Sequence, residues 1–153
     1  MKSKIIFFIH LIIKTFKLEN IVIKVCEILN IKKWKALPQN LLYKNDDNIK
    51  INKNNIIFKV NRNDFTQWQI YADYPELHFE SFLRNRNKGN VIDVGANIGS
   101  FSLKVANYFK NNKKNNKVIC FEPYLKIYKK LVENINLNEN LKNNLIVENI
   151  ALG

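Results

Sequence analysis

Residues 91–103 constrain the fold of this chain more than any other stretch. A short apolar run ends at Val94, a glycine-containing turn follows, and apolar residues then recur at helical spacing. This order predicts a strand, a loop and a helix, with the strand buried as in a parallel sheet that is covered on both faces. Phe101, Val105 and Phe109 would share one face of that helix.

The predicted loop follows an acid, Asp93, and has the spacing Asp-x-Gly-x-x-x-Gly instead of the Gly-x-Gly-x-x-Gly of dinucleotide-binding folds. Gly95 lets the chain leave the strand in a conformation closed to residues with a Cβ atom, and Gly99 would let the helix start close to the strand. Asn97 stands where a middle glycine often occurs, and asparagine tolerates a left-handed backbone. A carboxylate would repel a pyrophosphate, so Asp93 favours a ligand with a cationic part, such as the ammonium and sulfonium groups of S-adenosylmethionine.

A second acid, Glu122, closes the next apolar run, residues 118–121. In doubly wound folds, an acid at the end of the second strand accepts hydrogen bonds from ribose hydroxyls. The alternative is an ordinary acid that caps a helix whose first turn contains Pro123. The two roles are compatible, so the sequence leaves both open.

Three segments carry a resemblance to a known family: "VIDVGANIGSFSL", "FEPYLKIYKKLVENINLNE" and "NIALG". Over residues 90–153 the chain resembles the FkbM family of S-adenosylmethionine-dependent methyltransferases. The resemblance implies S-adenosyl-L-methionine as cofactor and methyl transfer to a hydroxyl oxygen of a sugar, glycan or small metabolite. With the reasoning above, it gives a set of expected cofactor-binding residues: Asp93, Gly95, Ala96, Asn97, Gly99, Glu122 and Ala151. Ala151 and Leu152 follow the third strand and would line the adenine pocket.

The expected fold is α/β, an incomplete Rossmann-like class I methyltransferase sheet made of the first three βα units. Its strands are residues 91–94, 118–121 and 145–150, in the spatial order third, second, first. The first strand, which lies in the middle of the sheet in the family, would then be an exposed edge, and the chain would be a truncated enzyme. The part that builds the acceptor site would then be missing, so the sequence predicts no catalytic residue.

An N-terminal segment of helices and a hairpin, residues 1–70, is expected to precede the cofactor-binding half, residues 71–153. The apolar run of residues 5–13 is too short to span a bilayer and predicts a helix that packs on the body of the protein. The alternative, favoured by the flanking lysines, is a helix lying at a membrane surface. Further along the chain the pattern predicts a helix over 19–31, strands over 56–60 and 65–71 that form a hairpin, and a helix over 75–86.

The formal net charge of the 153-residue chain is +12, which favours an anionic partner or else reflects a composition rich in asparagine, lysine and isoleucine. The lysines are scattered among asparagines, which favours compositional bias. No Asn-Pro-Pro-Tyr or Asp-Pro-Pro-Tyr motif occurs, which argues against a nucleic-acid methyltransferase. No Cys-x-x-Cys or histidine-rich cluster predicts a metal site, and Cys120 is expected to be a small core residue. The apolar start lacks a small-residue cleavage site, so a cytoplasmic protein is expected.

Two functions of different classes therefore remain. The first is an S-adenosylmethionine-dependent methyltransferase. The second is a non-catalytic remnant or interaction module that pairs its open sheet edge with a protein partner, which would complete the sheet.

Overall fold

The computed structural model describes residues 2–45, 47–74, 79–84 and 89–153. The chain divides into two compact units. The first unit comprises Met1–Ile49 and Val60–Pro75, and the second comprises Lys50–Lys59 and Glu76–Gly153. No helix within the described ranges combines the length and the apolar character needed to cross a membrane.

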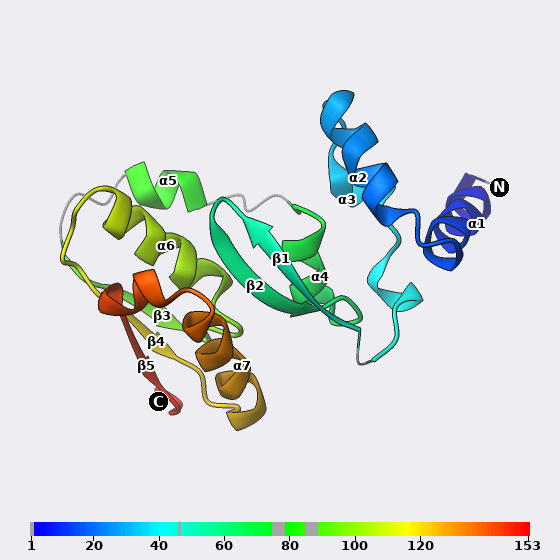
Figure 1. The fold of residues 1–153 in the computed structure, drawn as a ribbon. Helices are drawn as coiled ribbons and strands as arrows, with labels where there is room; N and C mark the ends of the chain where they lie inside the picture. Colours follow the sequence, from blue (N-terminus) through cyan, green and yellow to red (C-terminus); the bar gives the residue numbers. More distant parts are fainter. Residues whose placement is uncertain (1, 46, 75–78, 85–88) are drawn as a thin grey trace. The chain divides into compact units, whose positions relative to one another are not determined.

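The first unit is helical (Figure 1). Its helices are α1 (Lys2–Thr15), α2 (Glu19–Ile28), α3 (Lys33–Ala36), the 3-10 helix η1 (Asn40–Leu42) and α4 (Phe65–Tyr71). The first two confirm the predicted helices. An ionic cluster links distant parts of the unit: the Arg62 Nη2 atom lies 2.8 Å from Asp47 Oδ1, and Lys14 Nζ lies 3.3 Å from Asp47 Oδ2.

The prediction of a strand over residues 65–71 is wrong, because these residues form α4. Asp64 is the N-cap residue, and its Oδ1 atom accepts a hydrogen bond from the Gln67 backbone N–H at 3.0 Å. The same residues satisfy a helical spacing, and Trp68 is buried with its Nε1 atom donating to the Pro38 carbonyl at 2.8 Å. An N-cap and a buried helical face therefore outweigh the apparent alternation.

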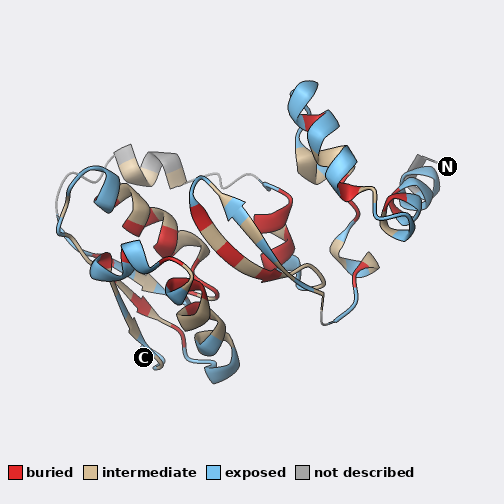
Figure 2. Cartoon of the chain, in the orientation of Figure 1, coloured by how far each residue is buried: buried red, intermediate tan, exposed pale blue. Residues whose placement is uncertain are grey.

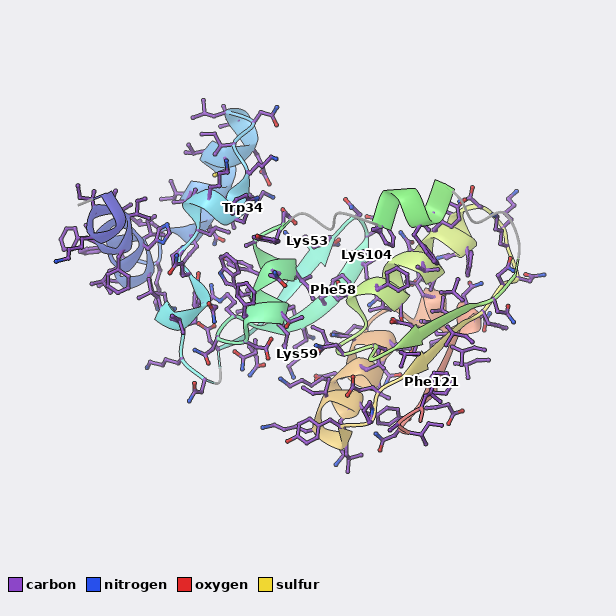
Figure 3. All side chains as sticks on the ribbon, turned by 180° about the vertical axis from the view of Figure 1, so that it is seen from behind. Trp34, Lys53, Phe58, Lys59, Lys104 and Phe121 are labelled. Carbon is purple, nitrogen blue, oxygen red and sulfur yellow. The ribbon has the colours of Figure 1, made fainter. Side chains whose placement is uncertain are left out.

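The predicted strand over residues 56–60 does form a hairpin, but with the preceding segment. Strands β1 (Asn48–Lys53) and β2 (Ile56–Asn61) pair as a two-stranded sheet. Asn54 and Asn55 connect them with positive φ angles of 51° and 64°, as a two-residue type I′ turn requires. Residues on β2 alternate in burial, with Phe58 buried and its neighbour Lys59 half-buried. Figure 3 labels both side chains on this strand.

The second unit contains a separate sheet of three parallel strands in the order β3-β4-β5. These strands are β3 (Val91–Val94), β4 (Val118–Phe121) and β5 (Leu145–Glu148). Helix α6 (Ser100–Asn111) joins β3 to β4, and helix α7 (Leu125–Asn136) with the 3-10 helix η2 (Glu139–Asn144) joins β4 to β5 (Figure 1). The three strands, their order and the edge position of β3 confirm the sequence prediction of a partial Rossmann-like sheet.

The prediction that both faces of this sheet are covered is wrong. Side chains of Asp93 and Cys120 meet Ser102 of α6, so α6 covers that face, which also carries the buried Val91. Ile92 and Val94 alternate with these residues along β3, so they lie on the other face, and each is 63% exposed. No element of the described chain packs over them, so β3 has an open face as well as an open edge.

Helix α5 (Phe79–Arg84) lies against α6 through aromatic side chains. The ring of Phe101 on α6 lies 5.8 Å from the ring of Phe79 and 5.1 Å from that of Phe82. Phe101 therefore packs toward α5, whereas Val105 and Phe109 are buried. The ends of the predicted 75–86 helix fall outside the described residues.

The tip of the hairpin packs against α7 within the second unit. The backbone N–H of Lys59 donates to Asn134 Oδ1 at 2.7 Å, and that of Ile57 donates to Asn138 Oδ1 at 2.8 Å. The side-chain amide of Asn138 donates back to the Ile57 carbonyl at 2.7 Å. These asparagine side chains bind the β2 backbone in the way that a neighbouring strand would.

Candidate functional site

The loop between β3 and α6 is left-handed at three positions. Gly95, Asn97 and Gly99 have φ angles of 79°, 51° and 89°, so the expected tolerance of Asn97 for this backbone is realised. The backbone N–H groups of Gly95 and Ala96 both donate to the Phe121 carbonyl, at 2.8 and 3.0 Å. The start of the loop is therefore hydrogen-bonded to the carboxyl end of β4, next to Glu122.

The two glycines have different surroundings. A Cβ atom added at Gly95 would meet nothing within 4 Å, so the loop backbone is open to an approaching molecule there. A Cβ atom at Gly99 would lie 2.8 Å from Leu131 Cδ1 of α7. Gly99 was expected to allow close approach to the strand, but the close neighbour is α7.

The Glu122 carboxylate holds two loops together. Glu122 Oε2 accepts the backbone N–H of Asn97 at 2.9 Å, and Oε1 accepts that of Tyr124 at 3.0 Å. Its side chain is buried. Helix α7 begins at Leu125 with Tyr124 as N-cap, so the prediction that Pro123 lies in its first turn is wrong. Each carboxylate oxygen can accept more than one hydrogen bond, so these contacts are compatible with ribose binding as well.

The Asp93 carboxylate is turned toward α6. Its Oδ2 atom accepts a hydrogen bond from the Ser102 hydroxyl, and the Cys120 thiol donates to the same hydroxyl oxygen at 3.0 Å. Burial raises the pKa of Asp93, the Ser102 hydrogen bond opposes that rise, and the charge of Glu122 adds to it. Burial also raises the pKa of the Cys120 thiol to about 11, as suits the predicted core residue.

Three polar residues of the site were missed by the sequence reasoning. Ser102 lies on the buried face of α6, where a hydroxyl needs a hydrogen-bond partner. Its position on the apolar side of the predicted helix could therefore have marked it as a polar residue of the site. Asn134 donates from Nδ2 to the Ile98 carbonyl of the loop at 2.9 Å. Asn149 donates from Nδ2 to the carbonyls of Glu122 and Pro123, at 2.8 and 3.1 Å. No local pattern marks these two asparagines in a chain this rich in asparagine.

Ala151 and Leu152 lie beyond β5 at the same carboxyl edge of the sheet, and both are exposed. Asn149 brings their segment close to the end of β4, beside Glu122. The structure thus gathers Asp93, the loop and Glu122 into one site, whereas Ala151 extends from its margin. Within the described residues, no group of three or more histidine, cysteine or acidic side chains is placed to hold a metal ion.

No family of protein sequences matches the chain, and no curated protein matches it. Solved structures similar to it include two from Pyrococcus horikoshii. The putative transferase PH0793 of Pyrococcus horikoshii is 25% identical, with 87% of this chain and 47% of that chain aligned at a TM-score of 0.46. TYW2 of P. horikoshii, solved in complex with MeSAdo, is 24% identical over the same shares of the two chains, at a TM-score of 0.47. The chain therefore spans about half the length of the solved structures that it matches.

The site combines two acids with a loop whose backbone is open at one point. Asp93 and Glu122 close adjacent parallel strands, and the loop between Gly95 and Gly99 leads into the N-terminus of α6. Carboxylates at this position attract cationic groups and accept hydrogen bonds from hydroxyls, and they disfavour phosphates. This arrangement can therefore bind a molecule that carries both a sugar and a positive charge.

Proposed function

We propose that this chain is the cofactor-binding half of an S-adenosylmethionine-dependent methyltransferase resembling the FkbM family. One observation carries the proposal: the Asp93 and Glu122 carboxylates flank a left-handed loop that is open at Gly95, at the carboxyl ends of adjacent parallel strands. Ligands of open α/β sheets bind at this edge. The pairing of the loop motif with the Phe-Glu-Pro segment supports the choice of this cofactor.

In the proposed complex, the Glu122 carboxylate would accept hydrogen bonds from the ribose hydroxyls. The negative charge of Asp93 would attract the ammonium and sulfonium groups. Gly95, Ala96, Asn97 and Gly99 bring the loop backbone alongside the ligand, and Ala151 lines the adenine side. The cofactor supplies the methyl group, and the chain orients it for in-line displacement. The proposed acceptor is a hydroxyl of a sugar or small metabolite, and a base near that hydroxyl would remove its proton.

Calorimetric titration with S-adenosylmethionine tests the proposal. Two ribose hydrogen bonds to a carboxylate contribute about 1.5–3 kcal/mol each, so Glu122→Ala should weaken binding at least about tenfold. A second ligand, 5′-methylthioadenosine, keeps the ribose and adenine but lacks the ammonium and sulfonium groups. Glu122→Ala should weaken both ligands, whereas Asp93→Asn should weaken S-adenosylmethionine selectively.

Glu148→Ala is the matched control, because it removes an exposed acid from the end of the neighbouring strand β5. Binding by this variant should equal that of the wild type. Thermal unfolding of each variant checks that the loop contacts of Glu122 have not been lost together with the fold. A folded wild-type chain that binds neither ligand would refute the proposal.

The second candidate, an interaction module, is favoured by the open edge and open face of β3. An edge strand with unpaired backbone groups invites pairing with another chain. Such a module would associate with a protein partner without binding S-adenosylmethionine. The same titration therefore separates the two candidates.

A further inference from the structure

Helix α1 presents apolar side chains over most of its circumference. Only His10 and Ile13 among its described side chains are buried, and these lie on one side of the helix. Ile5, Phe8, Leu11 and Ile12 lie on the opposite side and are exposed, with Phe8 at 61%. Figure 2 draws most of α1 in the colour of exposed residues. These four residues are called the α1 face below. An exposed apolar patch of this kind marks an interaction site.

The expectation that this helix packs on the body of the protein is therefore fulfilled only by its inner side. His10 and Ile13 are buried there, and burial lowers the pKa of His10. Lys14 Nζ lies 3.3 Å from Asp47 Oδ2 and 4.6 Å from the centre of the Tyr43 ring. These contacts hold α1 to its unit while leaving the α1 face uncovered.

The length of α1 is inconsistent with a membrane span. Its 14 residues would extend about 21 Å at the usual rise per residue, whereas the hydrocarbon core of a bilayer is about 30 Å thick. An apolar helix of this length can instead lie in the plane of the lipid–water interface.

The charges around α1 indicate what kind of surface the α1 face would bind. The first 18 residues contain four lysines and no acid, since Glu19 is the first carboxylate of the chain. Lys4 and Lys17 are exposed at the two ends of the apolar run. Lysines that flank an apolar helical face bind anionic lipid headgroups, and the net charge of +12 acts in the same direction over a longer range. A protein groove would satisfy the apolar residues but would not account for the absence of acids.

We propose that the α1 face docks this protein onto an anionic lipid surface. Phe8, at the centre of the face, inserts with Ile5, Leu11 and Ile12 at the level of the headgroups, and the flanking lysines contact lipid phosphates. This role is independent of cofactor binding, because the residues belong to the first unit and the candidate site to the second.

Flotation with lipid vesicles tests the proposal on the full chain. The wild type should float with vesicles of phosphatidylcholine mixed with phosphatidylglycerol, and should float more weakly with phosphatidylcholine alone or at high salt. The double variant Phe8→Glu with Ile12→Glu should bind at least about tenfold more weakly, because it removes apolar area and places acids at the interface. Both side chains are exposed, so the fold should survive, as thermal unfolding would verify.

The control variant is Asn115→Glu with Asn140→Glu, which makes the same change in net charge at exposed positions of the second unit. It should bind nearly as well as the wild type. Three results would overturn the proposal: no flotation of the wild type, equal loss in both double variants, or a wild-type oligomer that dissociates when Phe8 is replaced. The last result would show that a second copy of the chain covers the α1 face.

Discussion

At the scale of single residues, Asp93 is subject to opposing demands from stability and from ligand binding. Its carboxylate is largely withdrawn from water, with the Ser102 hydroxyl as a partner, and the charge of Glu122 is nearby. A buried carboxylate without an opposite charge destabilises the folded chain. A cationic ligand would relieve that cost, so the cost itself favours binding of a positive group.

The pH dependence of stability should reveal this cost. The pKa of Asp93 is raised in the folded chain, so the folded state binds more protons than the unfolded state above the ordinary aspartate value of about 3.9. The free energy of unfolding should therefore decrease as the pH rises through the folded pKa. Asp93→Asn removes this contribution, so the variant should gain stability relative to the wild type between about pH 4 and neutrality. Urea unfolding across this range measures the difference, and parallel profiles for the two proteins would contradict the expectation.

The two loop glycines offer a matched pair. Alanine at either position should lower the free energy of unfolding by about 1–2 kcal/mol, because the backbone there is left-handed. Gly99→Ala should cost about 1–3 kcal/mol more than Gly95→Ala, because only its methyl group collides with Leu131. Denaturant unfolding measures both variants. Equal losses of stability would contradict the prediction and show that the Leu131 side chain or α7 shifts to make room for the methyl group.

At the scale of elements, α7 supports both the hairpin and the loop. Asn134 is fully buried and joins the Lys59 backbone N–H of β2 to the Ile98 carbonyl of the loop. Lys59 Nζ reinforces the contact through Glu133 Oε1 at 2.6 Å. A single helix therefore sets the position of the loop relative to the hairpin tip.

Replacing Asn134 should be costly. Asn134→Ala removes the partner of the part-buried Lys59 N–H and of the buried Ile98 carbonyl, at up to about 1–3 kcal/mol for each group. Asn136→Ala on the same helix is the control, since Asn136 is exposed and its replacement should change stability by less than about 0.5 kcal/mol. Urea unfolding compares the two. Equal small effects would show that water replaces the Asn134 contacts.

At the scale of the whole molecule, the sheet of the second unit has an open edge and an open face. Strand β3 has a free edge within the described chain, and the face with Ile92 and Val94 carries no covering helix. Exposed apolar strands of this kind associate. The open edge and face are where a protein partner would complete the sheet, as the sequence led us to propose.

Sedimentation velocity should detect this association. The sedimentation coefficient of the wild type should rise with protein concentration, and Ile92→Lys should reduce that rise because a charge blunts an edge strand. Phe8→Lys replaces a side chain of similar exposure on α1 and serves as the control. A wild type that stays monomeric, or equal effects of the two variants, would show that the β3 edge does not pair.

Elements with local sequence signals were predicted correctly. The acid, glycines and helical spacing around Asp93 specified β3, the left-handed loop and α6, and the apolar runs specified β4 and β5. The order of the strands was expected from the resemblance to a methyltransferase family, and the structure has the same order. Residues 65–71 were wrongly predicted as a strand, because over seven residues the apolar positions fit both the two-residue period of a strand and the 3.6-residue period of a helix. The N-cap at Asp64 favours the helix.

The contacts of individual side chains could not be predicted, because they depend on how distant segments pack. Asp93 contacts Ser102 nine residues away, and Asn134 and Asn138 bind a hairpin more than seventy residues earlier. Burial of the two faces of β3 differs for the same reason: it depends on which helix lies across the sheet, and Ile92 and Val91 are equally apolar. Periodicity along a chain reports which residues share a face. What covers that face depends on contacts between segments distant in sequence, and no local pattern encodes them.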